Sequence, residues 1–271
     1  MLTRILSALV LIPLVLLVAY RCSPLAFALV VTGVGTLCFH EFQGMGRERM
    51  GASGGWALTV VAAAAGFFAV YPAFPDHRSV SAAAFFLVAG ALAVARGRGP
   101  GEALGRLAWP AVGFLYIFVL FSWLYDIRFG LSTDRGPLLL VLFFLVQWLG
   151  DSFAYLSGRL FGRHKLCEAV SPKKTVEGTL GGLLGSAGAG VAVALAGFPE
   201  RAWWPFAAAA VFLGAAGQVG DLMESLFKRC CGVKDSSGLI PGHGGMLDRI
   251  DSLLFTAPVF YFLMGMVLKH A

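Results

Sequence analysis

The sequence has few charged residues. Only 13% of its 271 residues are Asp, Glu, Lys or Arg, about half of the ~25% found in soluble globular domains. Too few polar side chains are therefore present to cover a water-facing surface of this size. Hydrophobic residues make up 58% of the chain and include 23 Phe and 6 Trp, which excludes a disordered protein. The mean hydropathy of +0.78 therefore predicts an integral membrane protein.

Cysteine is also scarce. The five cysteines, an odd number, include no CxxC pair, and the adjacent Cys230 and Cys231 have poor geometry for a disulfide bond. A disulfide framework and a structural zinc site are therefore not expected.

Several motifs of soluble enzymes are missing as well. The sequence contains no GxxxxGK[ST] loop and no GxGxxG after a strand, so it lacks the usual phosphate-binding loops of soluble nucleotide enzymes. It also lacks HExxH, which removes the commonest zinc-protease hypothesis.

The net charge of +6 does not indicate a nucleic-acid partner. The basic residues lie between long apolar runs and form no continuous basic domain. An anionic membrane surface and an anionic substrate are the better-matched partners, and we expect no nucleic acid to bind.

Apolar stretches recur along the whole chain and predict an all-α, polytopic membrane protein with about nine transmembrane helices. The first follows Arg4 and has no small-x-small cleavage site after it, so we expect it to remain as an anchor. The predicted spans are Ile5–Tyr20, Pro24–Glu41, Gly54–Tyr71, Val80–Ala95, Leu107–Tyr125, Pro137–Leu156, Val176–Ala196, Trp203–Met223 and Ile250–Leu268.

The distribution of Lys and Arg predicts the orientation. Fifteen of them fall on the side of the N-terminus and 6 on the other side, and the more basic side faces the cytoplasm. The N-terminus is then cytoplasmic and the C-terminus outside. The polar connections 158–175 and 226–249 both lie in the cytoplasm. We expect residues 1–130 to form spans one to five, and residues 131–271 to form the catalytic region with spans six to nine.

A polar stripe marks the end of the sixth span. Gln147, Asp151, Tyr155 and Arg159 follow one another at intervals of four residues, so they share one face of a helix. An aspartate within a membrane helix is unfavourable in free energy unless it is ion-paired or hydrated. Asp151 therefore indicates a functional site, although pairing with Arg159 near the interface is the plainer alternative.

The seventh span opens with a basic segment, Ser171-Pro-Lys-Lys-Thr-Val-Glu-Gly178. Lys173 and Lys174 add positive charge near a helix N-terminus, where free N–H groups already favour anions such as phosphate. Contact with lipid headgroups is the alternative. The pairs Gly178/Gly182 and Gly181/Gly185 predict close helix packing.

Acidic residues mark the ends of the last two spans. Gln218, Asp221, Glu224, Ser225 and Lys228 share one face of the eighth helix, while Asp248 and Asp251 lie one turn apart at the start of the ninth. Four carboxylates are therefore expected to converge, and hard oxygen ligands suit Mg²⁺ completed by a triphosphate. Alternatively, these acids pair with Lys228, Arg229 and Arg249 at a solvated helix end.

A glycine-rich segment, Pro241-Gly-His-Gly-Gly245, connects these two helices. Its backbone N–H groups can approach an anion closely. For His243, contact with phosphate and a structural hydrogen bond are equally plausible. Cys230 and Cys231 are expected to be packing residues.

Three blocks together resemble the phosphatidate cytidylyltransferase (CDP-diacylglycerol synthase) family. They are Asp151-Ser-Phe-Ala-Tyr155, Ser171 to Gly178, and the long stretch from Ser225 through Pro241-Gly-His-Gly-Gly-Met-Leu-Asp248-Arg-Ile-Asp251. The resemblance is strong over about residues 145–265 and rests only on hydropathy before that. It implies a homodimeric enzyme of the bacterial inner membrane, facing the cytoplasm, that converts CTP and phosphatidate to CDP-diacylglycerol and pyrophosphate.

The resemblance also suggests roles for individual residues. Asp221 and Asp248 match carboxylates that hold Mg²⁺ with an accompanying K⁺, and Glu224 and Asp251 are further metal candidates. The catalytic candidates are Asp221, Asp248, Lys228, Arg229 and His243. The substrate-binding candidates are Asp151, Tyr155, Ser171, Lys173, Lys174, Thr175, Lys234, Asp235, Gly244, Gly245 and Arg249.

Two other functions remain as alternatives at this point. A CTP-dependent lipid kinase of the polyprenol or phytol type would leave CDP, whereas the transferase leaves pyrophosphate and attaches cytidine to lipid. A cation-dependent transporter would place ionisable residues at midplane depth on several helices, but the carboxylates here cluster at the predicted cytoplasmic ends.

Overall fold

A computed structural model describes residues 13–47, 55–97, 99–132, 134–239 and 244–270. Nearly all of this part is helical. Residues 13–21 form a helix that is followed by α2 (Pro24–Met45), α3 (Gly55–Val70), α4 (His77–Arg96), α5 (Pro100–Phe114), the π-helix η1 (Leu115–Val119), α6 (Trp123–Phe129), α7 (Gly136–Phe161), the strands β1 (Lys165–Cys167) and β2 (Ser171–Thr175), α8 (Val176–Gly197), α9 (Trp204–Cys231) and α10 (Leu247–His270).

Seven helices in the described part are long and apolar enough to cross a membrane. They are α2, α4, the continuous stretch Pro100–Phe129, α7, α8, α9 and Leu247–Lys269 of α10. The third predicted span is the shorter helix α3, with 16 residues, and the first half of the first predicted span lies outside the described residues. The membrane character of the chain is confirmed, while the count of nine spans stays a prediction.

Two connections differ from the sequence-based expectation. The predicted spans leave residues 96–106 as a connection between the fourth and the fifth, but α5 already begins at Pro100, and proline is tolerated at the first turn of a helix. Ser171–Thr175, predicted to open a helix, instead forms β2, which pairs antiparallel with β1. The Thr175 hydroxyl accepts a hydrogen bond from the Gly178 amide at 3.1 Å, so the helix starts only after this cap.

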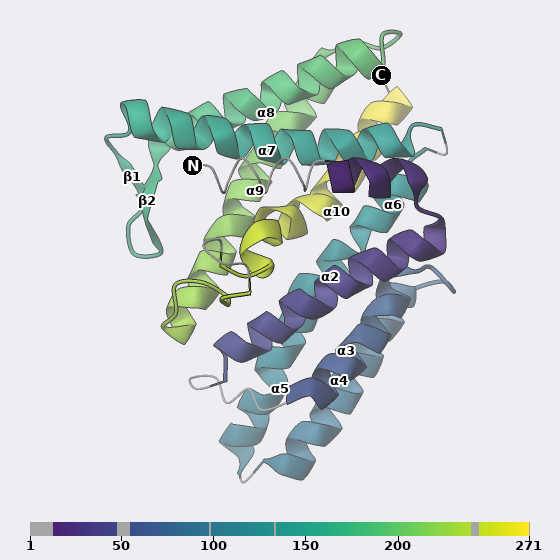
Figure 1. Cartoon of the computed structure of the whole chain (residues 1–271), viewed down its shortest axis with the longest axis vertical. Coiled ribbons are helices and arrows are strands. Elements are labelled where there is room, and N and C mark those ends of the chain that lie inside the picture. Colours follow the sequence, from purple (N-terminus) through teal and green to yellow (C-terminus); the bar gives the residue numbers. More distant parts are fainter. Residues whose placement is uncertain (1–12, 48–54, 98, 133, 240–243, 271) are drawn as a thin grey trace.

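The helices form two groups joined by α9 and α10 (Figure 1). In one group α2, α3, α4 and α5 pack in sequence order, and in the other α8 lies along α7. The helix α9 packs against both α8 and α10, and the β1–β2 hairpin projects beside the ends of α7 and α8.

Glycines allow α7 and α8 to approach closely, as their spacing predicted. A Cβ atom added at Gly185 would lie 2.8 Å from the Leu149 carbonyl oxygen, and one at Gly178 would lie 2.9 Å from that of Ala154. Backbone thus meets backbone along this pair, which is the packing that small residues permit in membrane helices.

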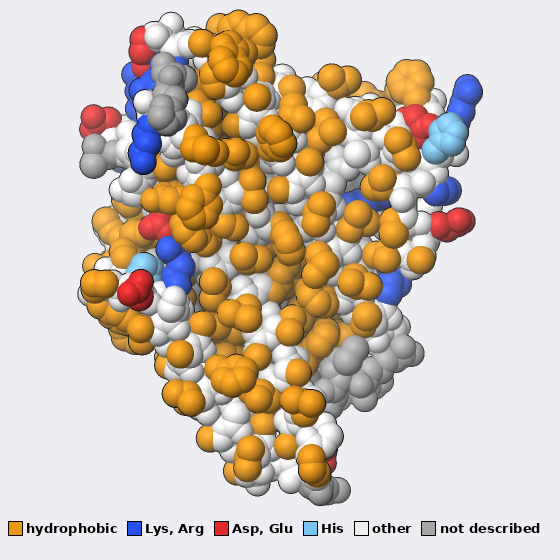
Figure 2. Space-filling model, turned by 180° about the vertical axis from the view of Figure 1, so that it is seen from behind, with side chains coloured by type: hydrophobic (Ala, Val, Ile, Leu, Met, Phe, Trp, Pro, Cys, Tyr) orange, Lys and Arg blue, Asp and Glu red, His pale blue; other side chains and the backbone are white. Residues whose placement is uncertain are grey.

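Aromatic side chains join the two groups of helices. Phe42 of α2 stacks on Trp109 of α5 with ring centroids 4.2 Å apart, and Phe227 of α9 meets it edge-on at 5.3 Å. The Trp109 indole also donates a hydrogen bond to the Phe42 carbonyl at 2.9 Å. On the outside, apolar side chains cover most of one face and charged ones lie mainly near its margins (Figure 2), as expected for a surface in contact with lipid.

Candidate functional site

Asp151 is the residue of the polar stripe of α7 that lies at the candidate site. Gln147 is buried, whereas Asp151, Tyr155 and Arg159 are exposed on the same helix. The Asp151 carboxylate interacts electrostatically with Asp221 of α9 and with Lys174 of β2. Asp151 therefore belongs to the group of charged residues contributed by other elements.

The basic segment of β2 reaches α9 through one lysine. The Lys174 ammonium pairs with the Asp221 carboxylate at 2.7 Å, and both side chains remain partly accessible. Ser225 lies one turn further along α9 and donates to Asp221 at 3.5 Å. Ser171 and Thr175 are half-buried in the same strand and Lys173 is exposed. An ion pair with accessible partners can rearrange when an anionic ligand arrives.

The Lys228 ammonium connects α9 to α10. It pairs with Glu224 on its own helix and, at 2.7 Å, with Asp248 at the start of α10. The Glu224 side chain is only 1% exposed, and its Oε1 atom has no hydrogen-bond partner in the described part of the chain. Glu224 and Asp248 therefore pair with Lys228 as the alternative proposed, but both carboxylates are buried and do not lie at a solvated helix end.

Asp248 also organises the segment before α10. Its Oδ2 atom accepts hydrogen bonds from the Ser236 amide at 3.0 Å, the Ser236 hydroxyl at 2.8 Å and the Gly245 amide at 2.7 Å. Gly244 has a φ of +80°, and a Cβ there would lie 2.5 Å from the same oxygen. Gly244 is thus required for the chain to wrap around this carboxylate.

The four predicted carboxylates lie in two related groups. Asp221 and Asp251 interact electrostatically with each other and with Asp151, while Glu224 and Asp248 share Lys228. Within the described ranges no three His, Cys, Asp or Glu residues have an arrangement that could hold a metal ion. The protein groups alone therefore do not form a complete cage.

The other candidate residues lie around this centre or outside the described part. Arg229 is exposed and donates to the carbonyls of Val170 and Val233 at 3.4 and 3.2 Å. Lys234, Asp235 and Arg249 are exposed around the connection between α9 and α10. His243 lies outside the described residues.

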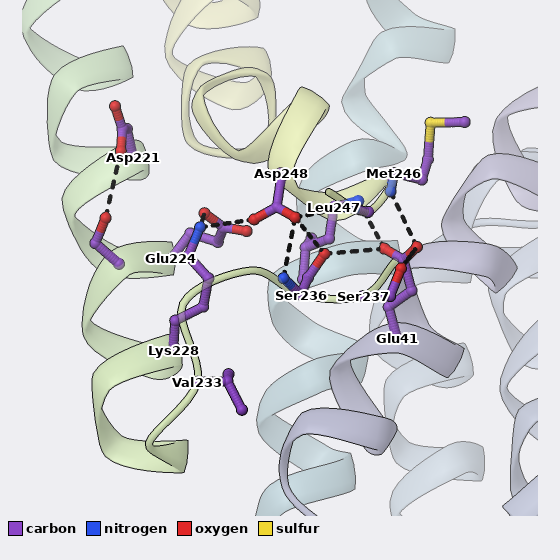
Figure 3. A network of polar contacts seen from close by, with 12 residues as sticks. Glu41, Asp221, Glu224, Lys228, Val233, Ser236, Ser237, Met246, Leu247 and Asp248 are labelled. Atoms are coloured by element: carbon purple, nitrogen blue, oxygen red, sulfur yellow. Dashed lines mark hydrogen bonds and ion pairs between the residues drawn. The ribbon is translucent and has the colours of Figure 1, made fainter. Parts of the chain in front are cut away.

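The sequence analysis missed Glu41, Ser236 and Ser237. Glu41, near the end of α2, is buried and accepts hydrogen bonds from both serine hydroxyls. Figure 3 shows its carboxylate beside the segment that binds Asp248. A carboxylate near the end of an apolar span can indicate a functional residue, but the sequence analysis placed the catalytic region in residues 131–271, which excludes Glu41.

Comparison with known proteins shows the family of the chain. A model of the cytidylyltransferase family matches residues 2–267. A phosphatidate cytidylyltransferase of Staphylococcus saprophyticus is 41% identical over 162 residues, which cover 59% of this chain and 57% of the relative. Those of Staphylococcus haemolyticus and Staphylococcus aureus are 39% and 40% identical over 162 and 149 residues, with 57% and 55% of each relative covered.

These matches therefore span little more than half the length of the relatives. The family model extends further, over almost the whole chain, and includes both groups of helices. The chain belongs to the cytidylyltransferase family.

Proposed function

We propose that the protein transfers CMP from CTP to phosphatidate, giving CDP-diacylglycerol and pyrophosphate. The observation that carries this proposal is the meeting of Lys174–Asp221 and Lys228–Asp248 at one end of long apolar helices. Such a position is accessible both to a lipid phosphate and to a water-soluble nucleotide. The names of the relatives, all phosphatidate cytidylyltransferases, supply the substrates.

The proposed reaction needs little base catalysis. Phosphomonoesters lose their second proton near pH 6, so the phosphate of phosphatidate is already mostly a dianion at neutral pH. One of its oxygens attacks the α-phosphorus of CTP, the bond from that phosphorus to the bridging oxygen breaks, and pyrophosphate leaves. The main barrier is repulsion between two anions, which positioned cations lower.

The described lysines are suited to this electrostatic task. Lys174 and Lys228 are each held by carboxylates, which positions both ammonium groups before substrate binds. We propose that Lys174, with Lys173 beside it, contacts one phosphate group, and that Lys228 and Arg229 stabilise the departing pyrophosphate. Ser171, Thr175, Tyr155, Lys234, Asp235, Gly244, Gly245, Arg249 and His243 remain candidates for substrate contacts.

The carboxylates fit Mg²⁺ by their donor chemistry. The carboxylates of Asp151, Asp221 and Asp251 interact electrostatically with one another. Within the described part of the chain Asp221 has one lysine partner, Lys174, so this group keeps negative charge that can attract a cation. We propose that Asp221 and Asp248 hold Mg²⁺, assisted by Asp251 and Glu224 and accompanied by K⁺. Mg²⁺ bound by these residues would supply positive charge against the phosphates, and phosphate oxygens would serve as its remaining ligands.

We further propose nine membrane crossings in the inner membrane, with the N-terminus and the site in the cytoplasm, and a homodimer as the working unit. Reporter fusions after His270 should behave as periplasmic, and those within residues 158–175 as cytoplasmic. An active cytoplasmic reporter after His270 would contradict this topology. It would direct attention to α3, the shortest of the candidate crossings.

The activity itself is tested with purified protein, labelled CTP, phosphatidate and Mg²⁺. Cytidine label in the lipid fraction together with released pyrophosphate supports the proposal. Labelled CDP with no cytidine in lipid would instead identify a lipid kinase. If a thermal unfolding measurement shows that the protein is folded and neither product forms, both the transferase and the kinase hypotheses are contradicted.

A further inference from the structure

Glu41 is a buried carboxylate contributed by the other group of helices. It is 7% exposed, and its two oxygens accept four hydrogen bonds. Oε1 accepts from the Ser237 hydroxyl at 2.7 Å and the Met246 amide at 3.0 Å, and Oε2 from the Ser236 hydroxyl at 3.3 Å and the Leu247 amide at 2.9 Å.

The four donors explain how this charge is accommodated. A buried carboxylate is costly unless hydrogen bonds replace its lost hydration. Met246 and Leu247 stand at the start of α10, where backbone amides have no partner within the helix and the helix dipole favours negative charge. Glu41 therefore caps α10 from a helix that lies about 200 residues earlier in the sequence.

The same contacts connect Glu41 to the candidate site. The Ser236 hydroxyl lies between Glu41 and Asp248, 3.3 and 2.8 Å from their oxygens, and its single proton can be donated to one of them at a time. Asp248 in turn pairs with Lys228. Figure 3 shows this continuous network from α2 to α9.

The packing leaves little freedom at this point. A Cβ atom added at Gly245 would lie 2.6 Å from Glu41 Oε2, so the backbone passes directly over the carboxylate. Both ends of the connection between α9 and α10 are thus attached to Glu41, through Ser236 and Ser237 at one end and Met246 and Leu247 at the other.

We propose that Glu41 is a positioning residue for the proposed transfer reaction: it holds residues 236–237 and 244–247 in the arrangement in which the Ser236 and Gly245 amides fix Asp248 beside Lys228. This inference rests on the proposed function. It assigns a role to a residue outside the blocks that carry the family resemblance, and it makes α2 part of the working site.

The test replaces Glu41 with Gln. Each carboxylate oxygen accepts one hydrogen bond from an amide and one from a hydroxyl. In either orientation of the Gln side chain, its NH₂ group, which is itself a donor, would therefore lie against a backbone N–H donor. Trp109→Phe is the matched control, because it removes a buried hydrogen bond to the neighbouring residue Phe42 and leaves the connection untouched. Glu41→Asp, which keeps the charge but is one methylene shorter, serves if Gln prevents folding.

Two measurements are made on each full-length protein. In the absence of substrates, amide hydrogen exchange at Met246 and Leu247 should become at least about tenfold faster in Glu41→Gln and stay unchanged in Trp109→Phe. In the transfer assay, kcat should fall at least about tenfold in Glu41→Gln, beyond any fall in Trp109→Phe at equal thermal stability.

The outcomes are distinguishable. Unchanged amide exchange in Glu41→Gln would show that Glu41 does not hold the connection between α9 and α10. Faster exchange with unchanged kcat and KM would show that Glu41 only caps the start of α10 and has no effect on the reaction. Either result overturns the inference. Failure of the proposed function would appear separately, as a wild-type protein that forms no cytidine-labelled lipid while its exchange still depends on Glu41.

Discussion

Replacing Lys228 with Met should strongly destabilise the protein. The Lys228 side chain is 12% exposed, and its carboxylate partners Glu224 and Asp248 are 1% and 8% exposed. Met keeps the length of the side chain but removes the positive charge, leaving two buried carboxylates opposite each other. Breaking a buried ion pair by removing one partner costs about 3–5 kcal/mol, so we expect a loss of that size in the free energy of unfolding.

Unfolding in detergent micelles with increasing denaturant measures this loss. Lys269→Met is the control, because Lys269 is exposed near the end of α10 and should change stability by less than about 0.5 kcal/mol. Adding Glu224→Gln to Lys228→Met should recover a measurable part of the loss, because it removes one uncompensated charge. A loss below about 1 kcal/mol for Lys228→Met would refute the claim that Lys228 neutralises a buried pair.

Three further substitutions test neighbouring parts of the account. Asp221→Asn should reduce transfer activity about 10²-fold with little change in thermal unfolding, because its side chain is 38% exposed; near-normal turnover at limiting Mg²⁺ would contradict the metal role. Gly244→Ala should lower both stability and activity, since φ is +80° and the new Cβ would crowd Asp248, and an unchanged unfolding midpoint would contradict this. Cys230→Ser should retain full activity under reducing and oxidising conditions, because Cys230 is exposed and free, not packed as the sequence suggested, and loss of activity in this variant under either condition would contradict this.

The helices and the local polar stripes were predictable because both follow from periodicity. α8 begins and ends within a residue of its predicted bounds, and the spacing of Asp221, Glu224 and Lys228 places them correctly along α9. The hairpin was missed because β1 and β2 have three and five residues, too few for a strand pattern to be recognised. Pro172, which suits either the first turn of a helix or a tight turn, gives no indication of a strand either.

The partners of the acidic residues were not predictable from spacing. Helix periodicity shows which residues share a face, but not that Lys228 lies between Glu224 and Asp248, or that Lys174 reaches Asp221 from another element. Glu41 illustrates the same limit, because its partners lie about 200 residues away in the sequence. Such contacts depend on how the helices pack, which the local sequence does not encode.

The position of the phosphorus that is attacked tests the central claim most directly. Purified protein is incubated with phosphatidate, Mg²⁺ and CTP labelled at either the α- or the γ-phosphate. The account predicts that α-label enters the lipid fraction and that γ-label is released as pyrophosphate. Transfer of γ-label to lipid, with α-label remaining in CDP, would contradict it.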